Sequence, residues 1–206
     1  MAITISIALQ KGGVGKSTTA QALASTLGFK HKKVLLIDMD SQGNVTYSSG
    51  IDNPEYTIFD VLGEDCKIEE SLINCKYYDL LAADTYLTNI EMSENVESTL
   101  LKNALEPIKN DYDFIIIDTP PALGNLSFNS LVASDYIVIP TEPRPFALQG
   151  LGKLYDTIKS IRNTLNPALK VIGILLIKYN NRTVLNRDIK TMIEEYAKQM
   201  QTEVFN

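Results

Sequence analysis

A glycine-rich loop with two lysines is the segment best suited to chemistry. It reads LQKGGVGKSTTAQALA, residues 9–24, and nearly matches the phosphate-loop pattern G-x-x-x-x-G-K-[ST], with Gln10 in place of the first glycine. In such loops, backbone N–H groups and a helix N-terminus hold phosphate. We expect Lys16 to reach the β and γ phosphates and the Ser17 hydroxyl to ligate Mg²⁺. The expected nucleotide contacts are Gly12, Gly13, Val14, Gly15, Lys16, Ser17 and Thr18.

Three aspartates follow apolar runs that read as strands. Asp118 ends the run in DFIIIDTPP, and Asp38 and Asp40 lie in LLIDMDSQGN. Carboxyl ends of parallel strands meet at one edge of a sheet, so all three should face the phosphate loop. We expect Asp118, with Ser17, to hold Mg²⁺ and Asp38 to support it. Asp40 is expected to orient the attacking water. The alternatives are an aspartate that only caps its strand, for Asp118, and a solvated loop aspartate, for Asp40.

The elements that must position these residues alternate between strands and helices. Apolar runs predict strands at residues 3–9, 34–37, 114–117, 136–139 and 171–177, and apolar spacing predicts helices from residue 16 to 28, over 148–165 and over 189–200. Residues 58–62 and 68–73 read as short helices and residues 80–82 as a strand. The order predicts an α/β fold, a doubly wound and mostly parallel sheet with helices on both faces.

Composition limits the classes of protein that fit. The chain has 206 residues, is 45% hydrophobic and carries a net charge of −6. We expect one globular domain over residues 1–206, soluble and cytoplasmic, without a leader or membrane span. His31 is the single histidine, which excludes a histidine-based catalytic apparatus, and Cys66 and Cys75 read as reduced structural thiols.

Five motifs in this order resemble the deviant Walker A ATPases, specifically the ParA group of chromosome and plasmid partition proteins. They are QKGGVGKST, VLLIDMDSQGN, DFIIIDTPPALG, SDYIVIPTEP with ALQGL, and NNRT. The resemblance implies a P-loop ATPase domain that uses ATP and Mg²⁺ and covers most of the chain. The family has proline at the position of Ser41, a departure that could alter the hydrolysis rate.

The resemblance also implies a role for the second lysine. Two chains would enclose two ATP molecules, and Lys11 would reach the phosphate bound by the facing subunit, like an arginine finger. Residues 40–44 and 119–125 occupy the places of the family's two nucleotide-sensing segments. Lys11, Lys16 and Asp40 are therefore the expected catalytic residues of an ATP-dependent homodimer.

Family likeness further implies nonspecific DNA binding, association with the nucleoid and stimulation by a ParB-type centromere-binding partner. Arg182 matches a family position associated with DNA, and basic residues near it in sequence are Lys178, Arg187 and Lys190. Scattered basic residues before an amphipathic helix are equally typical of a solvated face. Asn180 is expected near the adenine. The chain stops in the apolar start of another strand, so we expect a domain shortened at its C-terminus.

Two other classes share the loop. A MinD-like positioning ATPase would carry a basic amphipathic membrane helix, which this sequence does not display, so no membrane partner is expected. An iron–sulfur reductase of the nitrogenase type would place cysteines after the Mg²⁺ aspartate, whereas Cys66 and Cys75 both precede Asp118.

Overall fold

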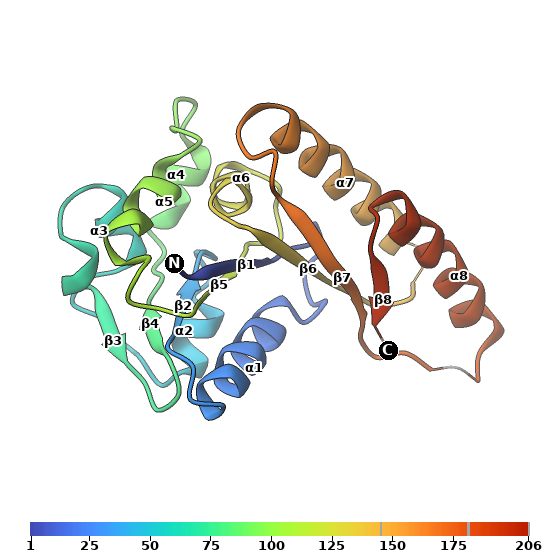
Figure 1. Ribbon diagram of the computed structural model, residues 1–206, viewed down its shortest axis with the longest axis horizontal. Coiled ribbons are helices and arrows are strands. Elements are labelled where there is room, and N and C mark those ends of the chain that lie inside the picture. The colour runs from blue at the N-terminus through green and yellow to red at the C-terminus, as the bar shows by residue number, and fades with distance from the viewer. Residues whose placement is uncertain (145, 181, 206) are drawn as a thin grey trace.

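The computed structural model describes residues 1–144, 146–180 and 182–205, which form one eight-stranded sheet flanked by helices (Figure 1). The strands are β1 Ile3–Ile7, β2 Val34–Asp38, β3 Leu72–Asn74, β4 Asp79–Leu81, β5 Phe114–Asp118, β6 Tyr136–Thr141, β7 Lys170–Leu176 and β8 Glu203–Phe205. The helices are α1 Lys16–Phe29, α2 Asn44–Ser48, α3 Ile58–Leu62, α4 Leu87–Met92, α5 Leu100–Leu105, α6 Asn125–Val132, α7 Ala147–Thr164 and α8 Val184–Gln199, with 3₁₀ turns at Ile68–Glu70 and Glu106–Ile108.

The strand order is β3-β4-β2-β5-β1-β6-β7-β8, and every pair is parallel except β3 with β4. This confirms the expected fold class. The central strands are almost wholly apolar because helices cover both of their faces. In β2, Leu36 packs with α1, whereas Leu35 and Ile37 pack with α3 and α5 on the other face. The result places the carboxyl ends of β1, β2 and β5 side by side.

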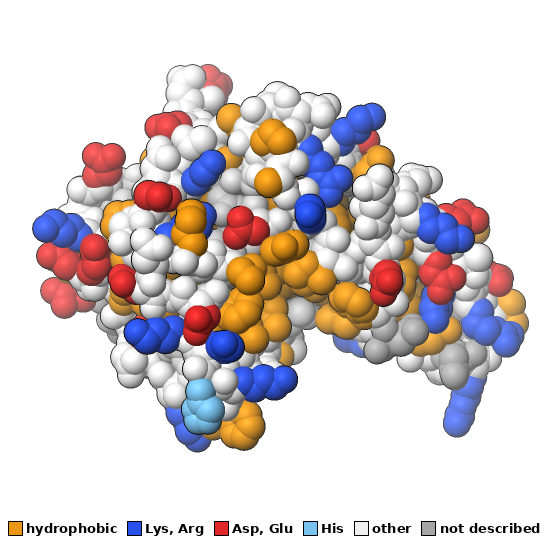
Figure 2. Space-filling model, viewed as in Figure 1, with side chains coloured by type: hydrophobic (Ala, Val, Ile, Leu, Met, Phe, Trp, Pro, Cys, Tyr) orange, Lys and Arg blue, Asp and Glu red, His pale blue; other side chains and the backbone are white. Residues whose placement is uncertain are grey.

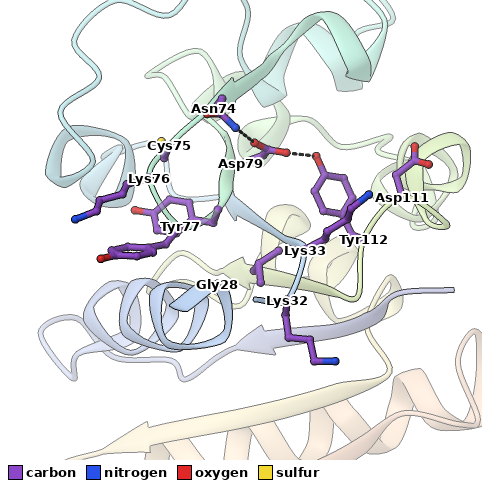
Figure 3. A pocket seen from close by; sticks show the side chains of 12 residues that line it. Gly28, Lys32, Lys33, Asn74, Cys75, Lys76, Tyr77, Asp79, Asp111 and Tyr112 are labelled. Carbon is purple, nitrogen blue, oxygen red and sulfur yellow. Dashed lines mark hydrogen bonds between the residues drawn. The ribbon is translucent and has the colours of Figure 1, made fainter. Parts of the chain in front are cut away.

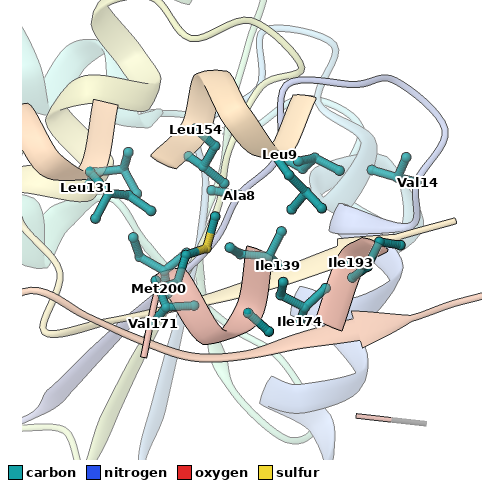
Figure 4. Close-up of a cluster of buried hydrophobic side chains, with 14 of the residues drawn as sticks. Ala8, Leu9, Val14, Leu131, Ile139, Leu154, Val171, Ile174, Ile193 and Met200 are labelled. Carbon is teal, nitrogen blue, oxygen red and sulfur yellow. The ribbon is translucent and has the colours of Figure 1, made fainter. Parts of the chain in front are cut away.

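Helices α7 and α8 cover the half of the sheet that β6, β7 and β8 form (Figure 1). Their apolar stripes bury Leu154 and Ile158 of α7 and Ile193 of α8 against Ile139 and Ile174 of the sheet (Figure 4). Each fully buried aliphatic side chain contributes about 1.5–3 kcal/mol of burial free energy. This core holds the end of β1, through Ala8 and Leu9, under the glycine loop.

The short helix predicted over residues 68–73 was wrong in its second half. Residues Ile68–Glu70 form a 3₁₀ turn, but Leu72–Asn74 form edge strand β3, antiparallel to β4 with Leu72 opposite Leu81. Two adjacent apolar residues fit a helical turn or a short strand equally well, and pairing with β4 decides between them. The predicted helix over 58–62 and the predicted strand near 80–82 are confirmed as α3 and β4.

None of the helices in the part of the chain that the structure describes has the length and apolarity needed to span a membrane.

Candidate nucleotide-binding site

The glycine loop joins the end of β1 to the first turn of α1. Gly13 and Gly15 have φ angles of +73° and +72°, in the left-handed region that side chains other than glycine rarely adopt. Gly15 directly precedes the helix, and no side chain caps the helix end there. The first N–H groups of α1 are therefore free to bind an anion, and the helix dipole favours negative charge at the same place.

A cavity of about 700 Å³ opens over this loop, a volume typical of small-molecule sites. The loop and the start of α1 form one wall, the segment after β2 forms the second, and the turn after β7 forms the third. Its lining residues are Gly12, Gly13, Gly15, Lys16, Ser17, Thr18, Thr19, Gln21, Asp40, Gln42, Asn44, Ser48, Pro121, Ile177 and Lys178. Val14 belongs to the loop but is buried in the α7 core beneath it.

Lys16 is buried at the base of this cavity, with 7% of its surface exposed. Its ammonium donates to the backbone carbonyl oxygen of Lys11 at 2.9 Å. Burial lowers the pKa of Lys16, while the negative charges of Asp118 and Asp40 raise it. A phosphate above the loop would add negative charge and favour the ammonium form.

Asp118 is fully buried, and neither of its carboxylate oxygens has a hydrogen-bond partner within 3.5 Å. Burial raises the pKa of Asp118 to about 7; the Ser17 hydroxyl and the Lys16 charge lower it, and Asp38 and Asp40 raise it. Burying a carboxylate without a hydrogen-bond donor or a cation costs free energy, and a bound cation or donor removes that cost. A carboxylate beside a hydroxyl therefore fits a Mg²⁺ ion.

The described residues contain no group of three or more His, Cys, Asp or Glu side chains arranged to hold a metal ion. In phosphoryl-transfer sites Mg²⁺ takes one or two protein ligands and completes its shell with phosphate and water.

Asp38 lies beside Asp118, and the two residues are register partners in the β2–β5 pair. Asp38 differs because protein donors occupy both of its oxygens. Its Oδ2 accepts from the backbone N–H and the hydroxyl of Thr46, both at 2.9 Å, and its Oδ1 accepts from the Asp40 N–H at 3.2 Å. Burial raises the pKa of Asp38, and these donors lower it. These hydrogen bonds stabilise the segment after β2. Because both oxygens of Asp38 already accept from protein donors, Asp38 could support Mg²⁺ only indirectly, outside the ligands that contact the ion.

Asp40 lines the cavity and is nearly buried. Its Oδ1 accepts from the Gln42 N–H at 3.0 Å, and its backbone carbonyl accepts from the Gly43 N–H at 2.8 Å. This tight turn holds the carboxylate toward the space above the loop, where a water could approach a bound phosphate.

Lys11 belongs to the same loop, is partly exposed and is not among the residues that line the cavity. Near it stands Glu142, a nearly buried carboxylate that the sequence interpretation did not single out. Glu142 forms ion pairs with Lys178 at 2.6 Å and Arg144 at 2.7 Å. The hydrogen bond from Lys178 lowers the pKa of Glu142, with smaller contributions from Arg144 and Lys11. A carboxylate directly after the run YIVIPT of β6 was the sequence signal that could have identified it.

Comparison with known proteins shows the family. A protein-family model described as an AAA domain matches residues 2–171. A chromosome partitioning protein ParA from Myxococcus xanthus is 39% identical over 207 residues, covering 97% of this chain and 73% of the relative. The chain belongs to the ParA family of partition ATPases.

Solved structures of a plasmid partition protein and of a synthase share the fold of this chain. A plasmid partition protein from Borrelia burgdorferi superimposes with a TM-score of 0.81 at 31% identity, covering 98% of this chain and 96% of the other. A cobyrinic acid a,c-diamide synthase from Mycobacterium smegmatis, solved with ADP and magnesium, gives a TM-score of 0.89 at 32% identity, covering 95% and 82%. The same synthase has also been solved with an ATP analogue and magnesium.

The basic residues predicted to contact DNA divide into two groups in this ParA family member. Lys178 lines the nucleotide cavity and pairs with Glu142. Arg182 and Arg187 are exposed near the start of α8, while Lys190 lies 3.7 Å from Glu194 and over the ring of Tyr179. The sequence alone did not separate Lys178 from the others.

Asn180, predicted near the adenine, is occupied by contacts within its own turn. Its side-chain oxygen accepts from the Arg182 N–H at 3.0 Å, and its carbonyl accepts from the Asn186 side chain at 3.2 Å. It does not line the cavity over the glycine loop, whose apolar lining includes Pro121 and Ile177.

A second cavity, of about 450 Å³, lies between the turn after α1, the β3–β4 hairpin and the residues before β5 (Figure 3). Its central carboxylate, Asp79, accepts from the Asn74 amide at 2.9 Å and the Tyr112 hydroxyl at 2.8 Å. Here the ParA fold offers a carboxylate already satisfied by neutral donors, in contrast to the orphaned carboxylate at the glycine loop.

Proposed function

We propose that this protein is an ATP-dependent partition switch that hydrolyses ATP slowly, to ADP and phosphate, as a homodimer. The observation that carries the proposal is the division between the two lysines of one loop. Lys16 is buried at the base of the cavity, whereas Lys11 is partly exposed and is not among the residues that line it. A partly exposed lysine beside the cavity can act on phosphate held by another subunit, while the buried lysine serves phosphate of its own chain.

The remaining residues take roles that follow from their surroundings. Ser17 and Asp118 would hold Mg²⁺, which neutralises charge on the β and γ phosphates when bound. The N–H groups of Gly12 to Thr18 would cradle phosphate oxygens. Asp40 would hold the attacking water in line, because loose phosphoryl transfer depends mainly on position and on charge stabilisation. Asp38 keeps Asp40 in place through the Asp40 N–H.

The Lys11 position connects nucleotide state to assembly. The γ-phosphate gives the partner's lysine a charge to bind, and ADP removes most of that charge. Pairing would therefore persist with ATP and weaken after hydrolysis. The residues 119–125, which follow Asp118, would change their order with phosphate state.

The ATP dimer would bind DNA without sequence preference through Arg182, Arg187 and Lys190, and this would associate it with the nucleoid. Dimerisation doubles the number of cations, which offsets a chain charge of −6. A ParB-type centromere-binding protein is the proposed partner that stimulates hydrolysis. Lys178 would contribute mainly at the nucleotide, since this exposed side chain lines the cavity and pairs with the buried Glu142.

Light scattering with size separation tests the proposal. An Asp40→Ala variant should form a long-lived dimer with ATP and remain monomeric with ADP, and the dimer should bind random duplex DNA with a steep salt dependence. An ATP-bound protein that stays monomeric would contradict the proposal at its first step. An ATP-dependent dimer that does not bind DNA would contradict the DNA-binding part of the proposal and leave only the nucleotide-dependent dimerisation.

A further inference from the structure

Charge is distributed very unevenly along this chain. Residues 52–97 hold twelve of the 25 acidic residues but two of the 19 lysines and arginines, a net charge of −10. The remainder of the chain therefore carries +4 of the total −6. Figure 2 shows carboxylates gathered at the left end of the molecule, over the region that Figure 1 labels α3, β3 and α5. A field of this size selects cationic partners and accelerates their association.

A groove of about 400 Å³ crosses this acidic face. Its apolar walls come from Phe59 and Leu62 of α3, Ile90 of α4, Val96 in the segment before α5, and Leu100 at the start of α5. Four of these five side chains are half-buried and Leu62 is buried, so apolar surface remains open to solvent.

Two large apolar side chains stand at the margin of the groove. The Tyr86 ring packs over Phe59 with centroids 5.7 Å apart, yet 62% of Tyr86 is exposed. Met92, at the end of α4, is 80% exposed. Aromatic residues and methionine are enriched in the centres of protein interfaces.

Carboxylates surround this apolar strip. Glu97 lines the groove, Glu94 lies in the same connecting segment, and Glu64 and Asp65 follow the lining residue Gly63 in sequence. Across the residues whose placement is described, none of these carboxylates has a lysine or arginine nitrogen within 4.0 Å. The face thus combines unneutralised negative charge with an open apolar slot.

One wall of the groove is tied to the nucleotide-sensing segment. The Asn125 amide, at the start of α6, donates to the carbonyls of Ile90 at 3.1 Å, Glu91 at 3.3 Å and Ser93 at 2.7 Å. The Glu91 carboxylate accepts from the Leu126 N–H at 2.9 Å. The Asn129 amide donates to the Glu97 carbonyl at 3.1 Å. A change in residues 119–125 would therefore reach the groove wall directly.

We infer that this groove binds a short basic segment of a partner protein. A large apolar side chain of the segment inserts between Phe59, Val96 and Leu100, and its lysines or arginines face Glu94 and Glu97. Charge complementarity selects a cationic occupant, and the apolar slot requires one that also carries a hydrophobic anchor. The inference goes beyond the proposed function, because binding here requires neither ATP hydrolysis nor pairing of two chains.

The test uses the full chain and a fluorescein-labelled 12-residue peptide of lysines with two leucines, alongside the same peptide with both leucines replaced by serine. Fluorescence anisotropy at about 0.15 M salt should show clearly tighter binding of the leucine peptide. Glu94→Lys should weaken binding about fivefold, while the matched reversal Glu55→Lys should leave it nearly unchanged. Val96→Ser should weaken the leucine peptide about tenfold, with Val184→Ser on α8 as its control.

Backbone NMR locates the peptide. Signals of residues 93–97 and of the Leu126 N–H should shift on addition of the peptide. Equal weakening by Glu94→Lys and Glu55→Lys, or equal binding of the serine peptide, would reduce the effect to general charge attraction and overturn the inference. A dimer of the free protein that Glu94→Lys or Val96→Ser abolishes would assign the groove to a second copy of this chain, which also overturns it.

Discussion

Asp38 and Asp118 are register partners at the ends of β2 and β5, but protein donors satisfy Asp38 and leave both oxygens of Asp118 without a partner. Two adjacent carboxylates thereby acquire different functions. One braces the segment that carries Asp40, and the other is the residue of the pair that is prepared for a cation. The difference depends on Thr46, which donates twice to Asp38.

The free energy of unfolding should depend on pH through the buried, unpaired carboxylate of Asp118. The pKa of Asp118 rises from an ordinary 3.8 to about 7, so the folded chain binds a proton that the unfolded chain releases. Its stabilising contribution is full below about pH 4 and is lost as pH rises toward 7. Urea unfolding at successive pH values without Mg²⁺ should show this decline. The decline should be smaller in Asp118→Asn, and Mg²⁺ should stabilise only the unsubstituted protein. Parallel pH curves for the two proteins would refute this assignment.

Thr46→Val should destabilise the chain by about 2 kcal/mol, because it leaves Asp38 and the Ala83 N–H without the Thr46 hydroxyl in a buried site. Thr46→Ser retains the hydroxyl and serves as the control. Chemical denaturation measures the free energy of unfolding, and ATP turnover should fall in the valine variant because Asp40 loses its support. Equal stability of the valine and serine variants would show that the hydroxyl has no such role.

Substitutions of the two loop lysines should affect ATP binding and ATP-dependent dimerisation separately. Lys16→Ala should abolish ATP binding, because a phosphate at the base of the cavity loses its countercharge. Lys11→Ala should retain most of the affinity of the monomer but lose ATP-dependent pairing and turnover. Calorimetry with a non-hydrolysable ATP analogue measures the first effect and sedimentation the second. Normal pairing of the Lys11→Ala protein would argue against action between subunits.

Gly15→Ala should cost about 1–2 kcal/mol of stability, because Gly15 has a φ of +72° and a Cβ there would lie 3.0 Å from the Ile177 side chain. Gly12→Ala is the matched control in the same loop, since a Cβ at Gly12 meets no atom within 4 Å. Thermal unfolding and ATP affinity should both decline more for Gly15→Ala. A larger loss for Gly12→Ala would contradict the loop geometry.

The chemistry-bearing strands could be predicted because β2 and β5 are short apolar runs that end in aspartate. Edge strand β3 could not be predicted from the sequence. Leu72 and Ile73 take their extended conformation from pairing with β4, and no local sequence pattern indicates it. Short-range spacing predicts a helix or strand only where enough residues repeat it.

Side-chain partners were less predictable than strands. The sequence indicated that Lys178 belongs with the basic residues near α8, but its ammonium pairs with Glu142, 36 positions earlier in the chain. Thr46 gave no signal at all, since one threonine in a short helix is compatible with many roles. Contacts of this kind depend on how β2, β6 and β7 are placed by the whole sheet.

The hydrogen bond from the Lys16 ammonium to the Lys11 carbonyl has a consequence for the Lys16 side chain. The ammonium has three N–H donors and uses one of them on this carbonyl, so phosphate oxygens above the loop can accept from the others while the bond to Lys11 persists. The Lys16 side chain is thereby tethered at its tip as well as at its backbone. The charge that meets a triphosphate is held in position by the peptide group of the second lysine.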